Sequence, residues 1–349
     1  MSIEFEATTP EQRQELRAFL LEIFKLPETA PFVDPAILAW KYDTPRADWP
    51  GPRSHVYRKD GRLAAHGCIW PVTFQTVEGP VTSMRVIDWA GGRIVPGAGV
   101  MLMKKMTDFT ATVLAVGGSP ETQKVVPAIG FRVVGHCAQY AKVLRPWRQM
   151  RTYPAWNWKT PVRLVRNSFW SFGGGARAGW SWSAVPSLSS AVTLGEHDSK
   201  YIACKRTPER IEYLLKCPNA RMSVFVMEHQ GRTRGYGLLA HIAGQTRLAD
   251  LQLAGPSSAA DWAAAYSLSI SAAKADPEAC ELVTYSCLPH RAEALTACGF
   301  RATHSEPVYL LDPLKRLIKD PANPALPLDL QMADGDEFFL CDPARPYWT

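Results

Sequence analysis

The segment from Met84 to Met106 constrains the fold of this chain more than any other stretch. Its first part, Met84–Trp89, is short, apolar and rich in β-branched residues, which is typical of a half-buried strand. Turn-forming residues follow it at Gly91, Gly92, Pro96, Gly97 and Gly99. Apolar residues then recur at helical spacing as far as Met106. The segment therefore predicts a strand, a glycine-rich loop and a helix in direct succession.

The loop has the outline of a phosphate-binding site. Gly97 and Gly99 carry no Cβ, so a ligand can approach the backbone closely. The first amides of the following helix lack intrahelical partners, and the helix dipole favours an anion there. A dinucleotide-binding motif would need a third glycine where Leu102 stands, and no Gly-Lys-Ser/Thr completes a Walker loop. A turn whose glycines only permit tight packing is the alternative.

Composition indicates a globular chain of one large or two ordinary domains. Of its 349 residues, 46% are hydrophobic and 21% charged. No run of about 18 apolar residues predicts a membrane span, and the acidic N-terminus does not resemble a signal peptide. The eight cysteines are scattered without a C-x-x-C pair, so neither a metal site nor a disulfide framework is indicated. We therefore expect a cytoplasmic location.

Basic residues gather in the middle of the chain, where tryptophans are interleaved with them. The cations are Arg145, Arg148, Arg151, Lys159, Arg163 and Arg166, and the tryptophans are Trp147, Trp156 and Trp158. Such a stretch is able to touch nucleic acid or an anionic membrane. The simpler interpretation is a connector with packed aromatics and solvated charges, so we predict a linker at 147–194 and no nucleic-acid partner.

The strand, glycine-rich loop and helix resemble those of the GNAT superfamily of acyl-CoA-dependent acyltransferases. The resemblance rests on the strand Val86–Trp89, the turn Pro96–Val100 and the later Gly130-Phe131-Arg132. The family's loop usually reads Arg/Gln-x-x-Gly-x-Gly/Ala. Both glycines match here, but Ile94 stands where Arg or Gln is expected, and Arg93 precedes it. Trp40-Lys41-Tyr42 and Asp60-Gly61 also look like GNAT-like proteins of bacterial envelope and polysaccharide synthesis.

The second half of the chain repeats the first. Gly130-Phe131-Arg132 recurs as Gly299-Phe300-Arg301 and Gly61-Arg62 as Gly231-Arg232, at offsets of 169 and 170 residues. The strand at 85–89 resembles that at 247–251, at an offset of 162. We therefore predict an α+β fold of two tandem GNAT-like domains, each a mixed, mostly antiparallel sheet flanked by helices. The predicted boundaries are 1–146 for the first domain, 195–313 for a degenerate second copy without Gly-x-Gly, and 314–349 for a surface tail.

The resemblance implies a set of site residues. It makes Asp88 a candidate general base, with capping of the loop as the alternative, and Tyr140 a candidate proton donor to the departing thiolate, with core packing as the alternative. His66 and His136 are interpreted as structural. Thr122, Lys104 and Lys105 are further candidates beside the cofactor. The residues expected to bind acetyl-CoA or another acyl-CoA are Trp89, Ala90, Arg93, Gly97, Ala98, Gly99, Val100, Met101 and Gln123.

These patterns leave three functions open. The first is direct acyl transfer from acyl-CoA to an amine or hydroxyl of a small molecule or sugar, which needs no covalent enzyme intermediate. The second is an aminoacyl-tRNA-dependent, FemAB-like transferase, since that family also uses tandem GNAT-like domains. The third is an acyl-CoA-binding protein without catalysis, for which Ile94 is the best support. Neither the acceptor nor the oligomeric state can be inferred from these patterns.

Overall fold

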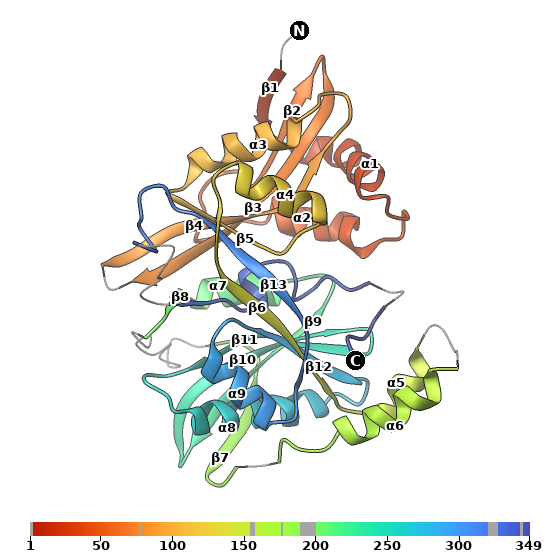
Figure 1. Ribbon diagram of the computed structural model, residues 1–349, viewed down its shortest axis with the longest axis vertical. Helices are drawn as coiled ribbons and strands as arrows, with labels where there is room; N and C mark the ends of the chain where they lie inside the picture. The colour runs from red at the N-terminus through yellow and green to blue at the C-terminus, as the bar shows by residue number, and fades with distance from the viewer. Residues whose placement is uncertain are drawn as a thin grey trace. The chain divides into compact units, whose positions relative to one another are not determined.

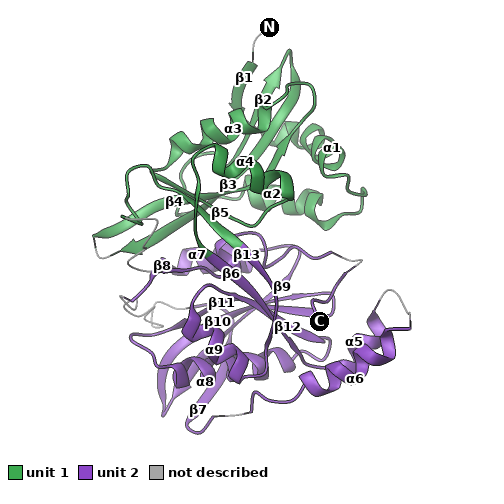
Figure 2. Ribbon diagram, viewed as in Figure 1, with its two compact units in different colours: residues 1–135, 307–326 green, residues 136–306, 327–349 purple. Residues whose placement is uncertain are grey.

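In this computed structural model we describe residues 3–76, 78–153, 158–175, 177–188, 200–319, 327–342 and 345–349 (Figure 1). The chain forms two compact units, and each is built from two stretches of sequence (Figure 2). Unit 1 contains Met1–Gly135 and Pro307–Leu326. Unit 2 contains His136–Glu306 and Pro327–Thr349.

Unit 1 is a mixed sheet with helices. Its strands, in spatial order, are β1 (Ile3–Ala7), β2 (Ser54–Lys59), β3 (Arg62–Thr76), β4 (Gly79–Gly91), β5 (Thr112–Val116) and the end of β13 (Arg301–Leu311). Neighbours are antiparallel except β4 and β5, which are parallel. The helices are α1 (Arg13–Phe24), α2 (Pro35–Tyr42), α3 (Ala98–Met106) and α4 (Pro120–Ala128).

Local signals in the sequence explain these elements. Asp60 and Gly61 both have positive φ (50° and 77°), as a tight β2–β3 hairpin requires. Asp34 caps α2 by accepting from the Ala36 amide, and Ser119 caps α4 in the same way. The apolar face of α3, which includes Leu102 and Met106, is buried in the core of unit 1.

Unit 2 repeats this plan. Its strands, in spatial order, are β6 (Arg132–Val143), β12 (Glu281–Ser286), β11 (Gln245–Leu253), β10 (Arg232–Ile242), β9 (Arg221–His229) and β7 (Trp180–Val185). Only β11 and β12 pair in parallel along this path. The helices are α5 (Pro146–Thr152), α6 (Thr160–Trp170), α7 (Pro208–Leu215), α8 (Ala259–Lys274) and α9 (Pro289–Ala297). A short β8 (Ile202–Cys204) pairs with β14 (Leu328–Asp329).

The internal repeat is confirmed by backbone geometry. Gln230 and Gly231 turn the β9–β10 hairpin with positive φ, as Asp60 and Gly61 turn β2–β3. In unit 1, Arg85 pairs with Leu114 in the parallel ladder, and in unit 2 Arg247 pairs with Val283. The predicted α+β class and the internal repeat are therefore correct.

The two repeats exchange their last strands. Residues 138–143 of β6 follow the first repeat in sequence, but they pair with β12 inside unit 2. Residues 308–311 of β13 follow the second repeat, and they pair with β5 inside unit 1. The compact units therefore differ from the predicted ranges 1–146 and 195–313, because each unit is completed by the final strand of the other repeat.

Two further segments differ from expectation. The predicted linker at 147–194 contains most of α5, all of α6 and β7, although 154–157, 176 and 189–194 lie outside the described residues. The tail predicted on the surface is instead buried in unit 2 over much of its described length. Its buried side chains include Leu328, Leu330, Met332, Phe338 and Phe339. Residues 320–326 and 343–344 lie outside the described part.

Candidate functional site

The candidate site lies where β4 and β5 part. The two strands pair only between 83–85 and 112–114, although β4 continues to Gly91 and β5 to Val116. Both α3 and α4 begin after the carboxyl ends of these strands. Because the carboxyl ends of parallel neighbours lie at one edge of a sheet, two helix N-termini face the opening between the strands. An extended ligand can lie along the unpaired edge of β4.

A β-bulge shapes this edge of β4. Cys68 pairs with Ile87 and His66 with Ala90, so Asp88 and Trp89 together oppose one residue of β3. Asp88 has a left-handed backbone, with φ of 54°. Neither Asp88 nor Trp89 has a Cα partner in the described registers with β3 and β5. The bulge therefore interrupts the ladder at the point where β4 and β5 separate.

Hydrogen bonds hold the bulge from both sides. The Nδ1 of His66 lies 3.0 Å from the carbonyl oxygen of Asp88, and its Nε2 lies 3.0 Å from the Ser54 hydroxyl. Burial lowers the pKa of His66 to about 4, so the neutral ring donates to the carbonyl and accepts from Ser54. On the other side, the Trp89 indole donates to the carbonyl oxygen of Gly99 at 2.7 Å. His66 is thus structural, as the sequence suggested.

The Asp88 carboxylate belongs to a buried ion pair. Its Oδ2 accepts from Lys41 Nζ and from the Tyr42 hydroxyl, each at 2.5 Å, and the Asp88 and Lys41 side chains are fully buried. Burial, and next the charge of Asp88, raise the pKa of Tyr42 well above its usual value. Lys41 also lies 4.4 Å from the centre of the Phe32 ring. These contacts tie the bulge to α2, which favours the positioning interpretation of Asp88 over the general-base one.

The two loop glycines have different surroundings. Gly97 caps α3 with φ of 78°, is exposed, and has open space where a Cβ would point. Gly99 is buried, and a Cβ there would lie 3.3 Å from the Cα of Gly91. Gly97 therefore leaves the start of α3 accessible, whereas Gly99 allows α3 to pack closely on the end of β4.

The other predicted ligand residues divide into exposed and buried ones. Arg93 and Met101 are exposed, Val100 is half-buried, and Ala90 and Ala98 are buried. Ile94 packs against the core of unit 1, so the position where the family has Arg or Gln presents no polar side chain. Arg93 is thus the exposed cation that this loop offers to a phosphate.

Four further candidate residues of unit 1 lie on α4 and at the far end of α3. Gln123 lies in the first turn of α4 and donates to the Gly118 carbonyl at 3.1 Å, while Thr122 contacts the Ser119 cap. Lys104 and Lys105 lie in the last turn of α3, and Lys105 pairs with Asp108 at 3.0 Å. The lysines are therefore at the opposite end of α3 from Gly97, where they complement the dipole of the helix.

Tyr140 and His136 belong to unit 2. Tyr140 pairs with Thr284 of β12 in the core of that unit, and His136 is exposed. Burial raises the pKa of Tyr140. In unit 1 the matching position, beside Ala115 of β5, is filled by Tyr309 through the strand exchange. Sequence reasoning missed Tyr309, although it lies 169 residues after Tyr140, the same offset as the Gly-Phe-Arg repeat.

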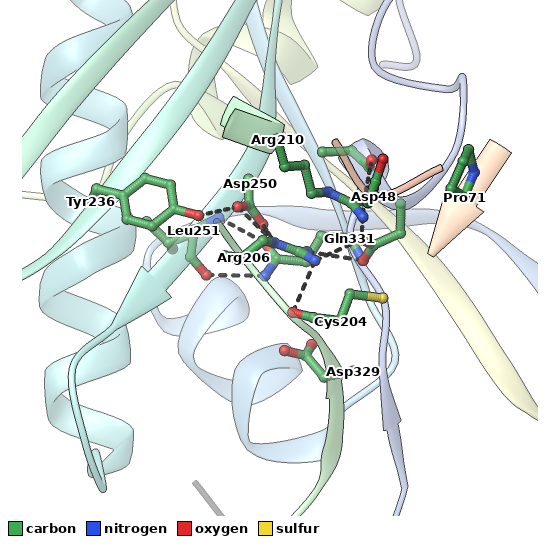
Figure 3. Close-up of polar contacts among 12 residues, drawn as sticks. Asp48, Pro71, Cys204, Arg206, Arg210, Tyr236, Asp250, Leu251, Asp329 and Gln331 are labelled. Atoms are coloured by element: carbon green, nitrogen blue, oxygen red, sulfur yellow. Dashed lines mark hydrogen bonds and ion pairs between the residues drawn. The ribbon is translucent and has the colours of Figure 1, made fainter. Parts of the chain in front are cut away.

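Unit 2 has the same opening between β11 and β12, but the chain fills it. Leu251 occupies the position of Trp89 in the repeat, and its amide donates to Gln331 Oε1 at 2.7 Å. The Nε2 of Gln331 donates back to the Leu251 carbonyl at 3.0 Å. Figure 3 shows Gln331 beside Leu251, next to the buried ion pair of Asp250 with Arg206. The C-terminal segment therefore occupies the strand edge that unit 1 leaves open.

A surface cavity of about 430 Å³ lies in unit 1 beside the Asp88 cluster. Tyr42 and Ser54 contribute to its wall, and both belong to the hydrogen-bonded groups around the bulge. The other lining residues come from Thr8, Pro10 and the segment 43–53. The wall mixes aromatic, hydroxyl and charged side chains, which suits a polar small molecule.

Comparisons with known proteins agree on the fold. No family model and no curated protein matches the sequence. A tandem GNAT protein from the clavulanic acid biosynthesis pathway is 13% identical, with a TM-score of 0.54 over 89% of this chain and 98% of that one. Saccharomyces cerevisiae N-myristoyltransferase with bound myristoyl-CoA is 11% identical, with a TM-score of 0.58 over 89% and 83%. A GCN5-related N-acetyltransferase from Anabaena variabilis is 12% identical, with a TM-score of 0.57 over 88% and 72%. The chain thus has a tandem GNAT fold.

Proposed function

We propose that the chain is an acyl-CoA-dependent acyltransferase whose unit 1 binds the acyl-CoA. The observation that carries the proposal is the open edge of β4 beside the glycine-capped start of α3. Unit 2 has the corresponding strand pair but closes it with Gln331. We therefore expect one acyl-CoA for each chain. The acceptor is an amine or a hydroxyl on a small molecule or sugar.

The phosphates are expected at the first turn of α3. Pro96 and Gly97 are exposed there; the Ala98 amide already donates to the Val95 carbonyl at 3.1 Å, and the remaining amides and the dipole of a helix start favour an anion. Arg93 supplies a nearby positive charge from the same loop. Gln123 lies in the first turn of α4, at the same edge of the sheet, where it can contact the pantetheine arm.

The thioester is expected to lie along the bulge of β4. The backbone amide of Trp89 would donate to the thioester carbonyl and stabilise the negative charge that develops on its oxygen. The acceptor nitrogen or oxygen attacks the carbonyl carbon, the C–S bond breaks, the acceptor loses a proton and the thiolate gains one. Because Lys41 and Tyr42 both donate to Oδ2 of the buried Asp88 carboxylate, we assign Asp88 to positioning of the bulge. The acceptor's proton then passes to water.

The cavity beside Tyr42 and Ser54 is our candidate for the acceptor. Its 430 Å³ volume suits a small polar molecule, and residues of its wall touch the cluster that holds the bulge. An acceptor bound there would lie beside the Asp88 cluster, because Tyr42 belongs both to the wall and to that cluster.

Introducing a negative charge at position 97 tests whether the phosphates of acyl-CoA bind at the start of α3. Aspartate and asparagine both tolerate a left-handed backbone, so Gly97→Asp and Gly97→Asn are expected to fold alike. Only the aspartate repels a phosphate. We expect Gly97→Asp to weaken acetyl-CoA or myristoyl-CoA binding by roughly tenfold or more, about 1.4 kcal/mol, in calorimetry, and Gly97→Asn to weaken it much less.

Gly255 provides a matched control in unit 2. It also has positive φ, at 70°, lies in open space, and occupies the loop between β11 and α8. Gly255→Asp should leave acyl-CoA affinity unchanged. Equal affinity of Gly97→Asp and the native chain would contradict the assignment. Release of free thiol with an acceptor separates an acyltransferase from a protein that only binds acyl-CoA, and turnover with aminoacyl-tRNA alone would favour the FemAB-like alternative.

A further inference from the structure

Helix α6 presents its apolar side to solvent. Val162, Val165 and Phe169 are 65%, 59% and 70% exposed, and their spacing of three and four residues places them on one face. Phe172, just after the end of α6, is 72% exposed, and Trp158, just before its start, is 78% exposed. We name these five residues the outer stripe. The predicted packing of the aromatics in this region is therefore wrong for Trp158, and also for Trp147, which is 62% exposed; Trp156 lies outside the described residues.

The opposite face of α6 is the more polar one, and it packs inside unit 2. Thr160 and Asn167 are buried, and Asn167 donates to the side-chain oxygen of Gln149 on α5 at 2.8 Å. Leu164 lines a narrow gap with Gln149 and Met150. Figure 2 shows α5 and α6 together at the edge of unit 2. An ordinary surface helix buries its apolar stripe, so the reversed orientation of α6 indicates a surface that something else covers.

The segment that carries the stripe has charges of one sign in its sequence. From Arg145 to Gly195 the sequence contains no aspartate or glutamate but has seven cations: Arg145, Arg148, Arg151, Lys159, Arg163, Arg166 and Arg177. Arg145 donates to backbone carbonyls of unit 2, including that of Lys274, and Arg148 pairs with Glu278. These two are used within the unit.

The cations beside the outer stripe remain at the surface. Arg151 and Lys159 are exposed, and Arg163 and Arg166 are half-buried. Arg163 stacks 4.6 Å from the Tyr153 ring and Arg166 4.2 Å from the Trp170 ring. Glu281 is an acidic residue of unit 2, but its carboxylate is already engaged, because the backbone amides of Trp348 and Thr349 donate to it. The surface beside the stripe is therefore cationic.

We infer that the outer stripe of α6 docks on an anionic membrane surface, with its flanking cations at the lipid headgroups. An apolar face bordered by Lys and Arg, with tryptophan at the margin, is the pattern of a helix that lies in the membrane interface. A second copy of the chain would bring the same cations together and repel itself. Nucleic acid would use the cations but leave Val162 and Val165 without an apolar partner. No helix of the described residues is long and apolar enough to cross a membrane, so the contact is peripheral.

Vesicle binding tests the inference. The full chain should float with vesicles of phosphatidylcholine mixed with phosphatidylglycerol but not with phosphatidylcholine alone, and added salt should release it. Val162→Ser/Phe169→Ser should reduce the bound fraction at least tenfold. Its melting temperature should stay unchanged, because both side chains are already exposed. Leu314→Ser removes an apolar side chain that is 63% exposed in unit 1, and it should bind like the native chain.

A second pair of variants separates charge from apolar contact. Arg151→Glu should weaken binding to the anionic vesicles, whereas Arg232→Glu, on the exposed β9–β10 hairpin, should not. Equal binding of the stripe variant and the native chain would overturn the inference, as would equal binding to neutral and anionic vesicles. Self-association or RNA binding that is lost in Val162→Ser/Phe169→Ser, without any vesicle binding by the native chain, would assign the stripe to those partners instead.

Discussion

Each unit buries an aspartate at the same point of the repeat, yet the two aspartates have different partners. In unit 1, Asp88 accepts from Lys41 and Tyr42, which are neighbours on α2. In unit 2, Asp250 accepts from Arg206 and from the hydroxyl of Tyr236 on the adjacent strand. The bulge near each carboxylate is retained as well. Both repeats thus need a buried negative charge here, and each neutralises it with a different cation.

The strand edge beside the carboxylate differs more than the carboxylate does. In unit 2 the C-terminal segment supplies Gln331 to the backbone of Leu251. The same segment supplies Asp334, whose carboxylate binds Arg206 and Arg210. Burial opposes ionisation of Asp334, but these two guanidinium groups hold its pKa below the usual range. The second copy thus has the same framework, while its tail occupies the strand edge that we assign to a ligand in unit 1.

The largest expected effect on stability comes from removing the cation that pairs with each buried aspartate. Arg206→Met leaves Asp250 with Tyr236 and takes one partner from Asp334, whereas Lys41→Met leaves only Asp88 without its cation. Loss of one member of a buried ion pair typically costs about 3–5 kcal/mol. We expect both variants to lose unfolding free energy in urea, with the greater loss in Arg206→Met. A smaller loss in Arg206→Met than in Lys41→Met would contradict this order.

A double variant sharpens the assignment of Asp88. Lys41→Met/Asp88→Asn removes both charges, so it should recover much of the stability that Lys41→Met loses. If Asp88 only positions the bulge, the double variant should keep measurable acyl transfer. Recovered stability with no transfer at all would return Asp88 to the role of general base.

How much of this the sequence predicts depends on the range of each interaction. Turns and caps are local, so nearby residues mark the Asp60-Gly61 hairpin and the starts of α2 and α8 at Asp34 and Ser258. The repeat shows in the sequence because matching segments recur at offsets of 162 to 170 residues. The Lys41–Asp88 pair joins residues 47 apart, and no local pattern marks it. The strand exchange is also invisible, because the strand after Gly-Phe-Arg has the same sequence pattern whichever unit it joins. Gln331 acts on Leu251 across 80 residues.

A smaller effect on turnover is expected from replacing the two tyrosines that occupy matching positions because the repeats exchange their last strands. Tyr309 lies beside β5 in unit 1, and Tyr140 lies beside β12 in unit 2. If a strand tyrosine protonates the departing thiolate, it is the one in the unit that binds acyl-CoA. Tyr309→Phe should then lower turnover by about 10²-fold, the lower end of general acid catalysis. Tyr140→Phe should leave turnover within about twofold in the same thiol-release assay. The reverse order would place the proton donor on β6.

The smallest effect concerns pH. Burial lowers the pKa of His66 in unit 1 from 6.5 to about 4, and burial, with Arg221 nearby, does the same to His241 in unit 2. Between about pH 6.5 and pH 4 the unfolded chain therefore binds more protons than the folded one, so stability is lost as the pH falls through this window. His66→Gln should reduce the slope of unfolding free energy against pH by up to about 1.4 kcal/mol for each pH unit, which is the contribution of one proton. His241→Gln should likewise remove the pH dependence of stability that His241 contributes in unit 2. Urea unfolding at several pH values measures both slopes, and a slope unchanged by His66→Gln would show that His66 is protonated in the folded chain.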